Sequence, residues 1–249
     1  MSKIEDFYIE GDVLVRYKGN EEDVVVPAGV RVVGESAFAE AEYTKSIALP
    51  KTVERIENRA FRKCEWLKKL SLPCGLKHIG LAAFYGCHAL KGSIRIPEGQ
   101  TEIERSTFKE CHALTSVTIP SSVEKIGEEA FFICSHIKSL QIPESVRSIE
   151  RKAFSAMGLT SLSLPHGLTE ISEGLFEGCR ALTELFIPAT VTKIGASAMK
   201  DCKALKTVRF GGTKAEWDAM PKGQLWDACY AGDKGFLPIG FKVEYGCEN

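Results

Sequence analysis

Large apolar residues recur along the chain at a fixed distance from a proline. Eight times, a proline is followed eleven residues later by phenylalanine or methionine, and these pairs recur about every 23 residues. A fixed period in the twenties is typical of a solenoid, in which each repeat is one rung that buries its apolar face against neighbouring rungs. The sequence therefore predicts a repeat solenoid. The pairs are Pro27/Phe38, Pro50/Phe61, Pro73/Phe84, Pro97/Phe108, Pro120/Phe131, Pro143/Phe154, Pro165/Phe176 and Pro188/Met199.

Each proline is preceded by a short alternation of apolar and polar residues. With the proline counted as position zero, positions −3 and −1 are aliphatic in every rung, as in Val117/Ile119 and Leu185/Ile187. Alternation with period two predicts one short parallel strand per rung of about 23 residues, with one face buried. Because proline has no N–H to donate, each strand is expected to end there.

The remainder of each rung predicts a short helical turn on the opposite side. Position +6 is valine or isoleucine, and positions +7 to +14 are rich in glycine and alanine, as in Gly80 to Cys87. This stretch is too short for a regular helix, and we expect one turn that points the residue at +11 inward. The aromatic rings should then stack along the solenoid. The rung interval is 24 from Pro73 to Pro97 and 22 from Pro143 to Pro165, and we expect solvent-facing loops to absorb both changes.

Two flanking segments do not follow the period and are interpreted as caps. Residues 1–22 are predicted to form an N-terminal cap hairpin, because apolar residues alternate around Glu10-Gly11-Asp12. Residues 23–210 hold the repeats, about eight to nine rungs, and residues 211–249 form a C-terminal cap. Without caps, the terminal rungs of a parallel stack would expose unpaired strand edges and an apolar cross-section.

The charge composition limits the classes of partner that are expected. The 249 residues include 32 basic and 33 acidic side chains without a basic stripe, so no nucleic acid or anionic membrane partner is expected. No run of 18 apolar residues and no signal peptide occurs, so we expect no membrane span and a cytoplasmic protein as the sequence is printed. An export signal upstream would instead place it at the cell surface or make it secreted. A monomer or a weak homodimer is expected.

The repeat unit resembles a known family. The segments Leu114 to Cys134 (LTSVTIPSSVEKIGEEAFFIC) and Leu159 to Cys179 (LTSLSLPHGLTEISEGLFEGC) resemble the BspA-like leucine-rich repeat, and Phe210 to Trp217 (FGGTKAEW) is similar to the family's exit from the array. The resemblance covers about residues 20–220. It implies a solenoid of the leucine-rich-repeat type and, for surface-exposed members, adhesion to host or neighbouring-cell proteins.

Cysteine and histidine do not predict reactive chemistry. Six cysteines share position +14 with Ala41 and Met157, so the position requires apolar volume, and we expect buried free thiols. His88 and His112 share +15 and should stack at the surface without a third metal ligand. The remaining histidines, such as His78, are expected in solvated loops. The six cysteines are Cys64, Cys87, Cys111, Cys134, Cys179 and Cys202.

No catalytic motif is recognised. The chain has no GxSxG, GxGxxG, P-loop, HExxH or CxxC pattern. The adjacent acids Glu128 and Glu129 are expected in exposed turns as solvated charges, not as an acid/base pair. We therefore expect no enzyme, no cofactor and no metal.

The outward face of the predicted strands is the candidate binding surface. Positions −4 and −2 form exposed columns in which serine and threonine dominate, and these columns also contain Arg95, Gln141, Glu184, Phe186 and Arg209. A phenylalanine beside an arginine is the usual composition of an interface hot spot.

These columns favour a non-catalytic module that binds a protein partner of unknown identity on a strand-lined concave face. The alternative is a carbohydrate-binding surface protein whose serine, threonine and glutamine columns bind glycan hydroxyls. Tyr85 and Phe132, both at +12 on the opposite side, are a second candidate patch.

Overall fold

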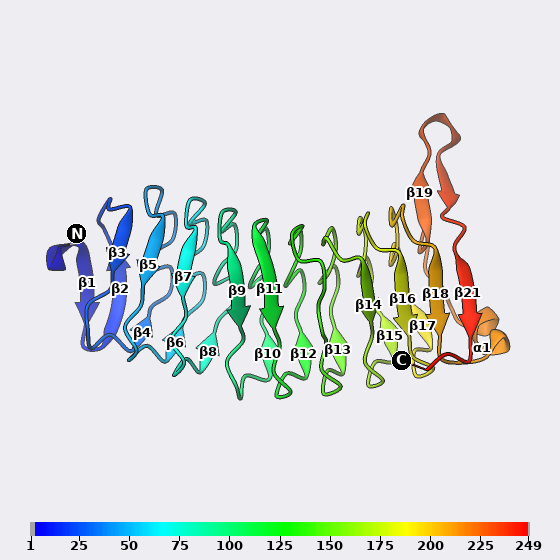
Figure 1. Cartoon of the computed structure of the whole chain (residues 1–249), viewed down its shortest axis with the longest axis horizontal. Helices are drawn as coiled ribbons and strands as arrows, with labels where there is room; N and C mark the ends of the chain where they lie inside the picture. Colours follow the sequence, from blue (N-terminus) through cyan, green and yellow to red (C-terminus); the bar gives the residue numbers. More distant parts are fainter. Residues whose placement is uncertain (1–2, 249) are drawn as a thin grey trace.

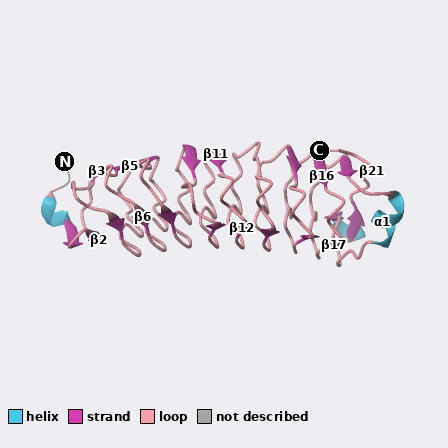
Figure 2. Ribbon diagram, turned by 90° about the horizontal axis from the view of Figure 1, so that it is seen from below, coloured by secondary structure: helices cyan, strands magenta, loops and turns pink. Residues whose placement is uncertain are grey.

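The strands predicted before the prolines form one side of an extended rod (Figure 1). The computed structural model describes residues 3–248; Met1, Ser2 and Asn249, at the ends of the two predicted caps, lie outside the described residues. The leucine-rich-repeat solenoid prediction is confirmed. Figures 1 and 2 show little curvature along the rod, so the strand-lined face is close to straight rather than concave. The long strands are β3 (Asp23–Val25), β5 (Ser46–Ala48), β7 (Lys69–Ser71), β9 (Gly92–Arg95), β11 (Leu114–Thr118), β14 (Ser161–Ser163), β16 (Glu184–Ile187) and β18 (Thr207–Phe210).

Each rung also has a second strand, which the sequence pattern did not predict. It is two residues long, lies at positions +5 and +6, and pairs in parallel with its neighbours below the long strands in Figure 1. Only the residue at +6 points inward, so no alternation is visible in the sequence. His78 lies in one of these strands and not in a loop, and its burial lowers its pKa. The short strands are β4 (Val32–Val33), β6 (Arg55–Ile56), β8 (His78–Ile79), β10 (Glu102–Ile103), β12 (Lys125–Ile126), β13 (Ser148–Ile149), β15 (Glu170–Ile171) and β17 (Lys193–Ile194).

The third side of each rung is made of turns. The turn predicted there is present, built as two successive turns rather than as a regular helix. Positions +9 and +13 have left-handed backbone, with φ of 50° to 61° at non-glycine residues such as Arg59 and Ile133. The N–H at +11 donates to the carbonyl at +10 of the next rung, as from Phe38 to Ala60 at 2.8 Å. We call these inter-rung hydrogen bonds of positions +9 to +13 the turn ladder.

The aromatic residues at +11 stack along the middle of the rod. Seven phenylalanines from Phe38 to Phe176 are fully buried, with neighbouring ring centroids 5.3 to 6.1 Å apart. The first four contacts, from Phe38 to Phe131, are nearly parallel, with interplanar angles of at most 13°. We call this set the aromatic stack.

The six cysteines at +14 are buried and free, as predicted. Each thiol donates to the carbonyl of the residue at +11 in the preceding rung, as from Cys64 to Phe38 at 3.0 Å and from Cys202 to Phe176 at 3.1 Å. Burial raises the pKa of Cys134 and of Cys179 to about 12. The thiols of Cys134 and Cys179 therefore stay protonated, and cysteine at this position supplies a weak hydrogen-bond donor in addition to apolar volume.

Both sheets are interrupted where the rung interval is not 23, and the long-strand sheet is also interrupted between β11 and residues 139–142, where the interval is 23. The long strands divide into β3-β5-β7, β9-β11 and β14-β16-β18, and the short strands divide between β8 and β10 and between β13 and β15. Residues 91–93, where the longer interval adds its residue, are exposed as expected, but neither parallel ladder continues past the two length changes. The turn ladder continues across both junctions, with Phe84 N–H to the Thr107 carbonyl at 2.9 Å and Phe154 N–H to the Leu175 carbonyl at 3.2 Å.

A glutamine side chain replaces the missing ladder between β8 and β10. The Ile79 N–H donates to Gln100 Oε1 at 3.0 Å, and Gln100 Nε2 donates to the carbonyls of Ile79 at 2.9 Å and Glu102 at 2.7 Å. Gln100 is buried, so water is kept from these groups. The amide thus supplies the hydrogen bonds that the 24-residue interval removes.

Replacing Gln100 by leucine should lower the free energy of unfolding by about 2–3 kcal/mol, because the buried N–H and C=O of Ile79 lose their partners. Urea unfolding followed by circular dichroism measures the change. Gln224→Leu, at an exposed glutamine, is the control and should change stability by less than about 0.5 kcal/mol. Equal stability of the two variants would show that the bridge is dispensable.

Both ends of the rod depart from the repeat. After the 3₁₀ turn Ile4–Asp6, strands β1 (Phe7–Glu10) and β2 (Val13–Tyr17) form an antiparallel hairpin, and β2 pairs with β4. After β18 come the helix α1 (Lys214–Ala219), the hairpin of β19 (Ala228–Tyr230) and β20 (Phe236–Pro238) around a 3₁₀ turn (Gly232–Lys234), and β21 (Lys242–Tyr245). Strand β21 pairs in parallel with β18, while the β19–β20 hairpin extends away from the rod (Figure 1).

Candidate interaction surface on the strand-lined face

Residues 139–142 occupy the place of the long strand in the sixth rung but belong neither to the β9–β11 sheet nor to the sheet that begins with β14. Within residues 3–248, no backbone hydrogen bond joins residues 139–142 to β11 or to β14. The aromatic stack tilts at the same rung, with interplanar angles of 35° from Phe131 to Phe154 and 30° from Phe154 to Phe176. The polar backbone groups of residues 139–142 are therefore without ladder partners on either side, although the interval is shortened only on the side of β14.

A groove of about 480 Å³ lies beside this segment on the long-strand side. Its polar lining includes Ser139 and Gln141 from the sixth rung, Ser161 and Ser163 from β14, and Glu184 from β16. Phe186 and Arg209 complete the end toward the C-terminus. We call this site the strand-face groove. It offers hydroxyl, amide, carboxylate and guanidinium groups in one shallow hollow.

Four of the five predicted binding residues meet in this groove. Gln141, Glu184, Phe186 and Arg209 line it, although they come from rungs six, eight and nine. Arg95 does not: it lies on β9 and lines a separate hollow with Cys74 and Glu98. The serines of the groove were predicted as members of the exposed serine and threonine columns, but they were not named as individual site residues.

Phe186 is not the exposed hot spot that its column suggested. It lies on the outward side of β16, paired in register with Ser163 and Arg209, yet its exposed fraction is 3%. The Arg209 guanidinium lies 5.9 Å above the ring, and the His166 ring packs 6.0 Å from it. The ring therefore forms part of the wall of the groove instead of projecting from it.

Arg209 is held in place by three groups. Besides covering Phe186, it donates from Nη2 to the Glu248 carbonyl at 2.8 Å and lies 3.7 Å from the Glu184 carboxylate through Nη1. Glu184 is half exposed and points its charge into the groove. Arginine and glutamate thus form a fixed charged rim at one end of a hydroxyl-lined hollow.

A larger hollow of about 740 Å³ lies at the same junction on the short-strand side. Most of its charged side chains already have partners, with Arg151 Nε 3.0 Å from Glu128 and Lys193 Nζ 3.3 Å from Glu170. A ligand would have to displace these ion pairs. The strand-face groove has the single ion pair of Glu184 with Arg209, and among the described residues its serines and Gln141 make no side-chain hydrogen bond, so it is the better candidate.

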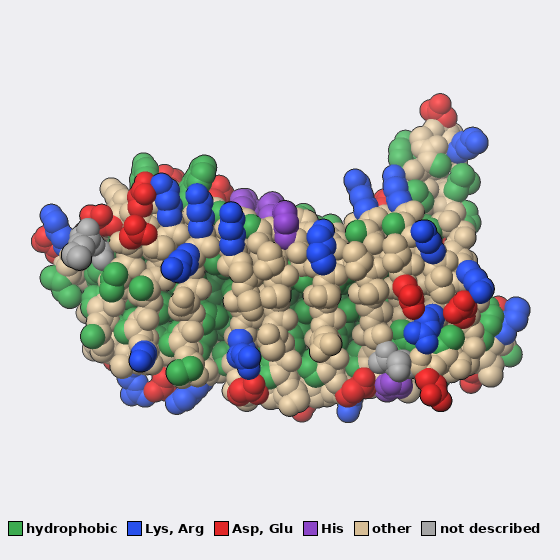
Figure 3. Space-filling model, viewed as in Figure 1, with side chains coloured by type: hydrophobic (Ala, Val, Ile, Leu, Met, Phe, Trp, Pro, Cys, Tyr) green, Lys and Arg blue, Asp and Glu red, His purple; other side chains and the backbone are tan. Residues whose placement is uncertain are grey.

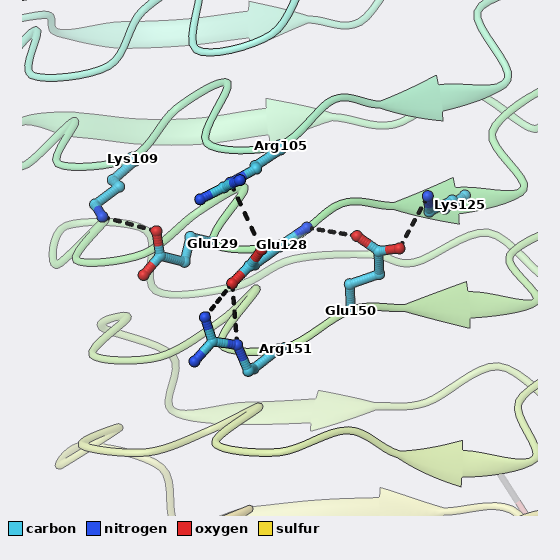
Figure 4. A network of polar contacts seen from close by, with 7 residues as sticks. All are labelled: Arg105, Lys109, Lys125, Glu128, Glu129, Glu150 and Arg151. Atoms are coloured by element: carbon cyan, nitrogen blue, oxygen red, sulfur yellow. Dashed lines mark hydrogen bonds and ion pairs between the residues drawn. The ribbon is translucent and has the colours of Figure 1, made fainter.

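Glu128 and Glu129 are not solvated charges as the sequence suggested. Their side chains are 21% and 18% exposed, and each binds cations of other rungs (Figure 4). Glu128 pairs with Arg105 at 3.5 Å and with Arg151, whereas Glu129 turns toward Lys109 at 2.7 Å. The two carboxylates point apart and serve as inter-rung ion pairs, which is incompatible with a shared acid/base role.

The second candidate patch, formed by Tyr85 and Phe132, is divided by the side chain of Lys109. The Lys109 ammonium lies 5.6 Å from the Tyr85 ring and 5.0 Å from the Phe132 ring, so it separates the two aromatic residues. Arg62 lies 5.8 Å over the other face of Tyr85. Alternating cations and rings satisfy one another here, and no continuous apolar surface remains.

His88 and His112 stack as predicted, with ring centroids 4.7 Å apart. Among residues 3–248, no group of three or more histidine, cysteine, aspartate or glutamate side chains is arranged to hold a metal ion.

In the same part of the chain, no helix is long and apolar enough to cross a membrane.

Figure 3 shows one feature that the balanced composition hides, a row of lysine and arginine side chains along the upper edge of the long-strand side. Lys45, Lys68 and Lys91 occupy the loop before the strand in consecutive rungs, and Lys138 and Lys206 lie at the same place farther on. Thr115, Thr160 and Thr183 interrupt the row. The sequence-based statement that no basic stripe exists is therefore corrected to a short stripe over rungs two to four.

The two parallel sheets, the turn ladder and the buried aromatic stack define a leucine-rich-repeat solenoid. The chain belongs to the BspA type leucine-rich repeat region family, whose six-copy pattern matches residues 15–131 and 101–219. No curated protein matches the sequence significantly.

Solved structures of bacterial repeat proteins have the same fold. The leucine-rich repeat protein of T. pallidum is 26% identical, with a TM-score of 0.54 over 90% of this chain and 98% of that one. A leucine-rich repeat protein from Bacteroides ovatus is 24% identical, with a TM-score of 0.53 over 90% of this chain and 73% of that one. The pneumococcal vaccine antigen PcpA is 21% identical, with a TM-score of 0.51 over 80% and 59%.

Proposed function

We propose that this protein is a non-catalytic, adhesin-like interaction module that binds a protein partner in the strand-face groove. The observation that carries the proposal is the unpaired backbone of residues 139–142 beside a groove lined by hydroxyl, amide and charged side chains. Backbone polar groups without ladder partners must bond to water or to a ligand. An extended peptide segment supplies the matching donors and acceptors.

The chemistry of the chain supports a binding role over a catalytic one. The thiols of Cys134 and Cys179 are kept protonated, since burial raises the pKa of each to about 12. The adjacent carboxylates Glu128 and Glu129 are bound to cations. The groove offers serine hydroxyl, amide, carboxylate and guanidinium groups at its surface, which suits hydrogen bonding to a partner.

Ser163→Arg should weaken partner binding at least tenfold, because a long cationic side chain would fill the middle of the groove. Ser71→Arg is the matched control, since Ser71 occupies the same exposed column three rungs before the groove begins. Both variants should keep the melting temperature within about 2 °C of the wild type.

The partner is first identified by cross-linking to wild-type protein, and its affinity for the purified variants is then measured by calorimetry. Loss of affinity in Ser163→Arg alone supports the groove as the site. Equal affinity of both variants would place the partner on another surface.

A carbohydrate ligand is the second candidate, favoured by the three serines and one glutamine in the groove. Sugar sites usually include an open aromatic face, and Phe186 is covered by Arg209. Binding on a glycan array that Ser163→Arg abolishes would support this ligand class, whereas an array without signal would remove it.

A further inference from the structure

Two aromatic side chains project into solvent at the same position of neighbouring rungs near the N-terminal end. Tyr43 is 59% exposed and Trp66 is 58% exposed. In the other rungs this position holds Ala89, Ala113, His136, Gly158, Ala181 and Ala204. The fold therefore does not require a large ring here, and exposing two of them to water is unfavourable unless something covers them.

A cleft of about 460 Å³ lies between these rings and is predominantly acidic. Three carboxylates line it, those of Glu40, Glu42 and Glu65, against one ammonium, that of Lys63. Glu40 is paired with Arg62 at 3.2 Å, whereas Glu42 and Glu65 have no ion-pair partner among residues 3–248. No ring contact joins Tyr43 to Trp66 among those residues, so the space between the rings is open.

We propose that this cleft binds a cationic side chain, arginine or lysine, from a basic segment of a partner protein. A cation placed over the face of tryptophan or tyrosine is attracted by the ring quadrupole, with tryptophan the strongest. Unpaired carboxylates on the rim add charge complementarity. The aliphatic stem of the same side chain covers the apolar edges of the rings.

The neighbouring lysine row does not oppose this assignment. Lys45 and Lys68 are two residues beyond the rings in sequence, but neither lines the cleft. Lys45 is neutralised by Glu22 at 2.6 Å. The cleft and the strand-face groove share no residue, so this proposal does not depend on the function proposed above.

Calorimetric titration with two capped peptides tests the proposal, one with the sequence Gly-Arg-Gly-Arg-Gly and one with glutamate in place of arginine. The arginine peptide should bind and the glutamate peptide should not, and added salt should weaken the binding. Trp66→Ala should lower the affinity for the arginine peptide at least about fivefold. Tyr230→Ala, which removes an aromatic residue of 57% exposure at the other end of the rod, should leave it unchanged.

Two double variants that remove the same charge distinguish binding in the cleft from a general attraction of the peptide to an acidic surface. Glu42→Gln with Glu65→Gln should weaken binding about threefold or more, whereas Glu170→Gln with Glu244→Gln, which removes the same charge elsewhere, should not. Equal weakening by both pairs, or no effect of Trp66→Ala, would overturn the proposal. So would binding of uncharged oligosaccharides that is unaffected by salt and lost in Trp66→Ala, because the cleft would then be a sugar site.

Discussion

Replacing Phe84 by alanine should lower the free energy of unfolding by about 3–5 kcal/mol. Phe84 is fully buried, and its ring lies 5.4 Å from that of Phe61 and 5.5 Å from that of Phe108. The cavity would be shared by three rungs that the turn ladder and the sheets hold at a fixed spacing. The neighbouring side chains can therefore move little to fill it. Urea unfolding followed by circular dichroism measures the loss.

Phe132→Ala is the matched control, because it deletes the same ring from a position that faces outward. Phe132 is half-buried and contacts the Lys109 ammonium at 5.0 Å. The expected loss is below about 1.5 kcal/mol, since mainly a partly exposed cation–π contact disappears. If both variants lost equal stability, the aromatic stack would not be the main source of rung cohesion.

Removing residues 211–249 should produce a protein that aggregates, because we propose that this segment is the C-terminal cap. Its strand β21 pairs with β18, and Trp217 packs 5.3 Å from Phe210 at the end of the core. The Met199 N–H also loses its bond to the Trp226 carbonyl at 2.6 Å. An open strand edge beside an exposed apolar cross-section promotes association between chains. Size-exclusion chromatography with light scattering measures the outcome.

The β19–β20 hairpin supplies the control for this deletion. It extends from the rod, so replacing residues 231–235 by a two-residue Asn–Gly turn should leave the chain monomeric with an unchanged melting temperature. A truncated chain that stays monomeric and melts like the full one would show that β21 and α1 do not act as a cap.

The rung architecture could be predicted because each of its determinants is local. Proline ends the strands, as at Pro188 after β16, and the inward residues at +6 and +11 follow from spacing alone. The short strands could not, because their pairing connects residues 23 apart and leaves no alternation within one rung. The bridge of Gln100 was equally invisible, since an isolated glutamine in a loop is ordinary in sequence.

The sequence predicted which site residues share an exposed column of the strand face, but it did not predict the contacts between their side chains. Register aligned Glu184 and Phe186 with their neighbours, as the period required, whereas Gln141 lines the same groove from a segment outside both sheets. The burial of Phe186 depends on how Arg209 and His166 fold over it, which no spacing rule contains. The groove itself lies where residues 139–142 leave the long-strand sheet, and the shortened interval after Pro143 lies on only one side of this segment.

The continuity of the turn ladder has a mechanical consequence. Three blocks of rungs meet at two junctions where the parallel ladders stop and the turn ladder continues. Elsewhere these junctions are crossed only by isolated hydrogen bonds such as those of Gln100 and Thr160, so the molecule should bend most easily there, with the turn side as the hinge. Under tension along its axis, extension would begin at these two junctions before any block loses its internal hydrogen bonds. A molecule tethered between two bodies would then yield first beside the residues proposed to hold its partner.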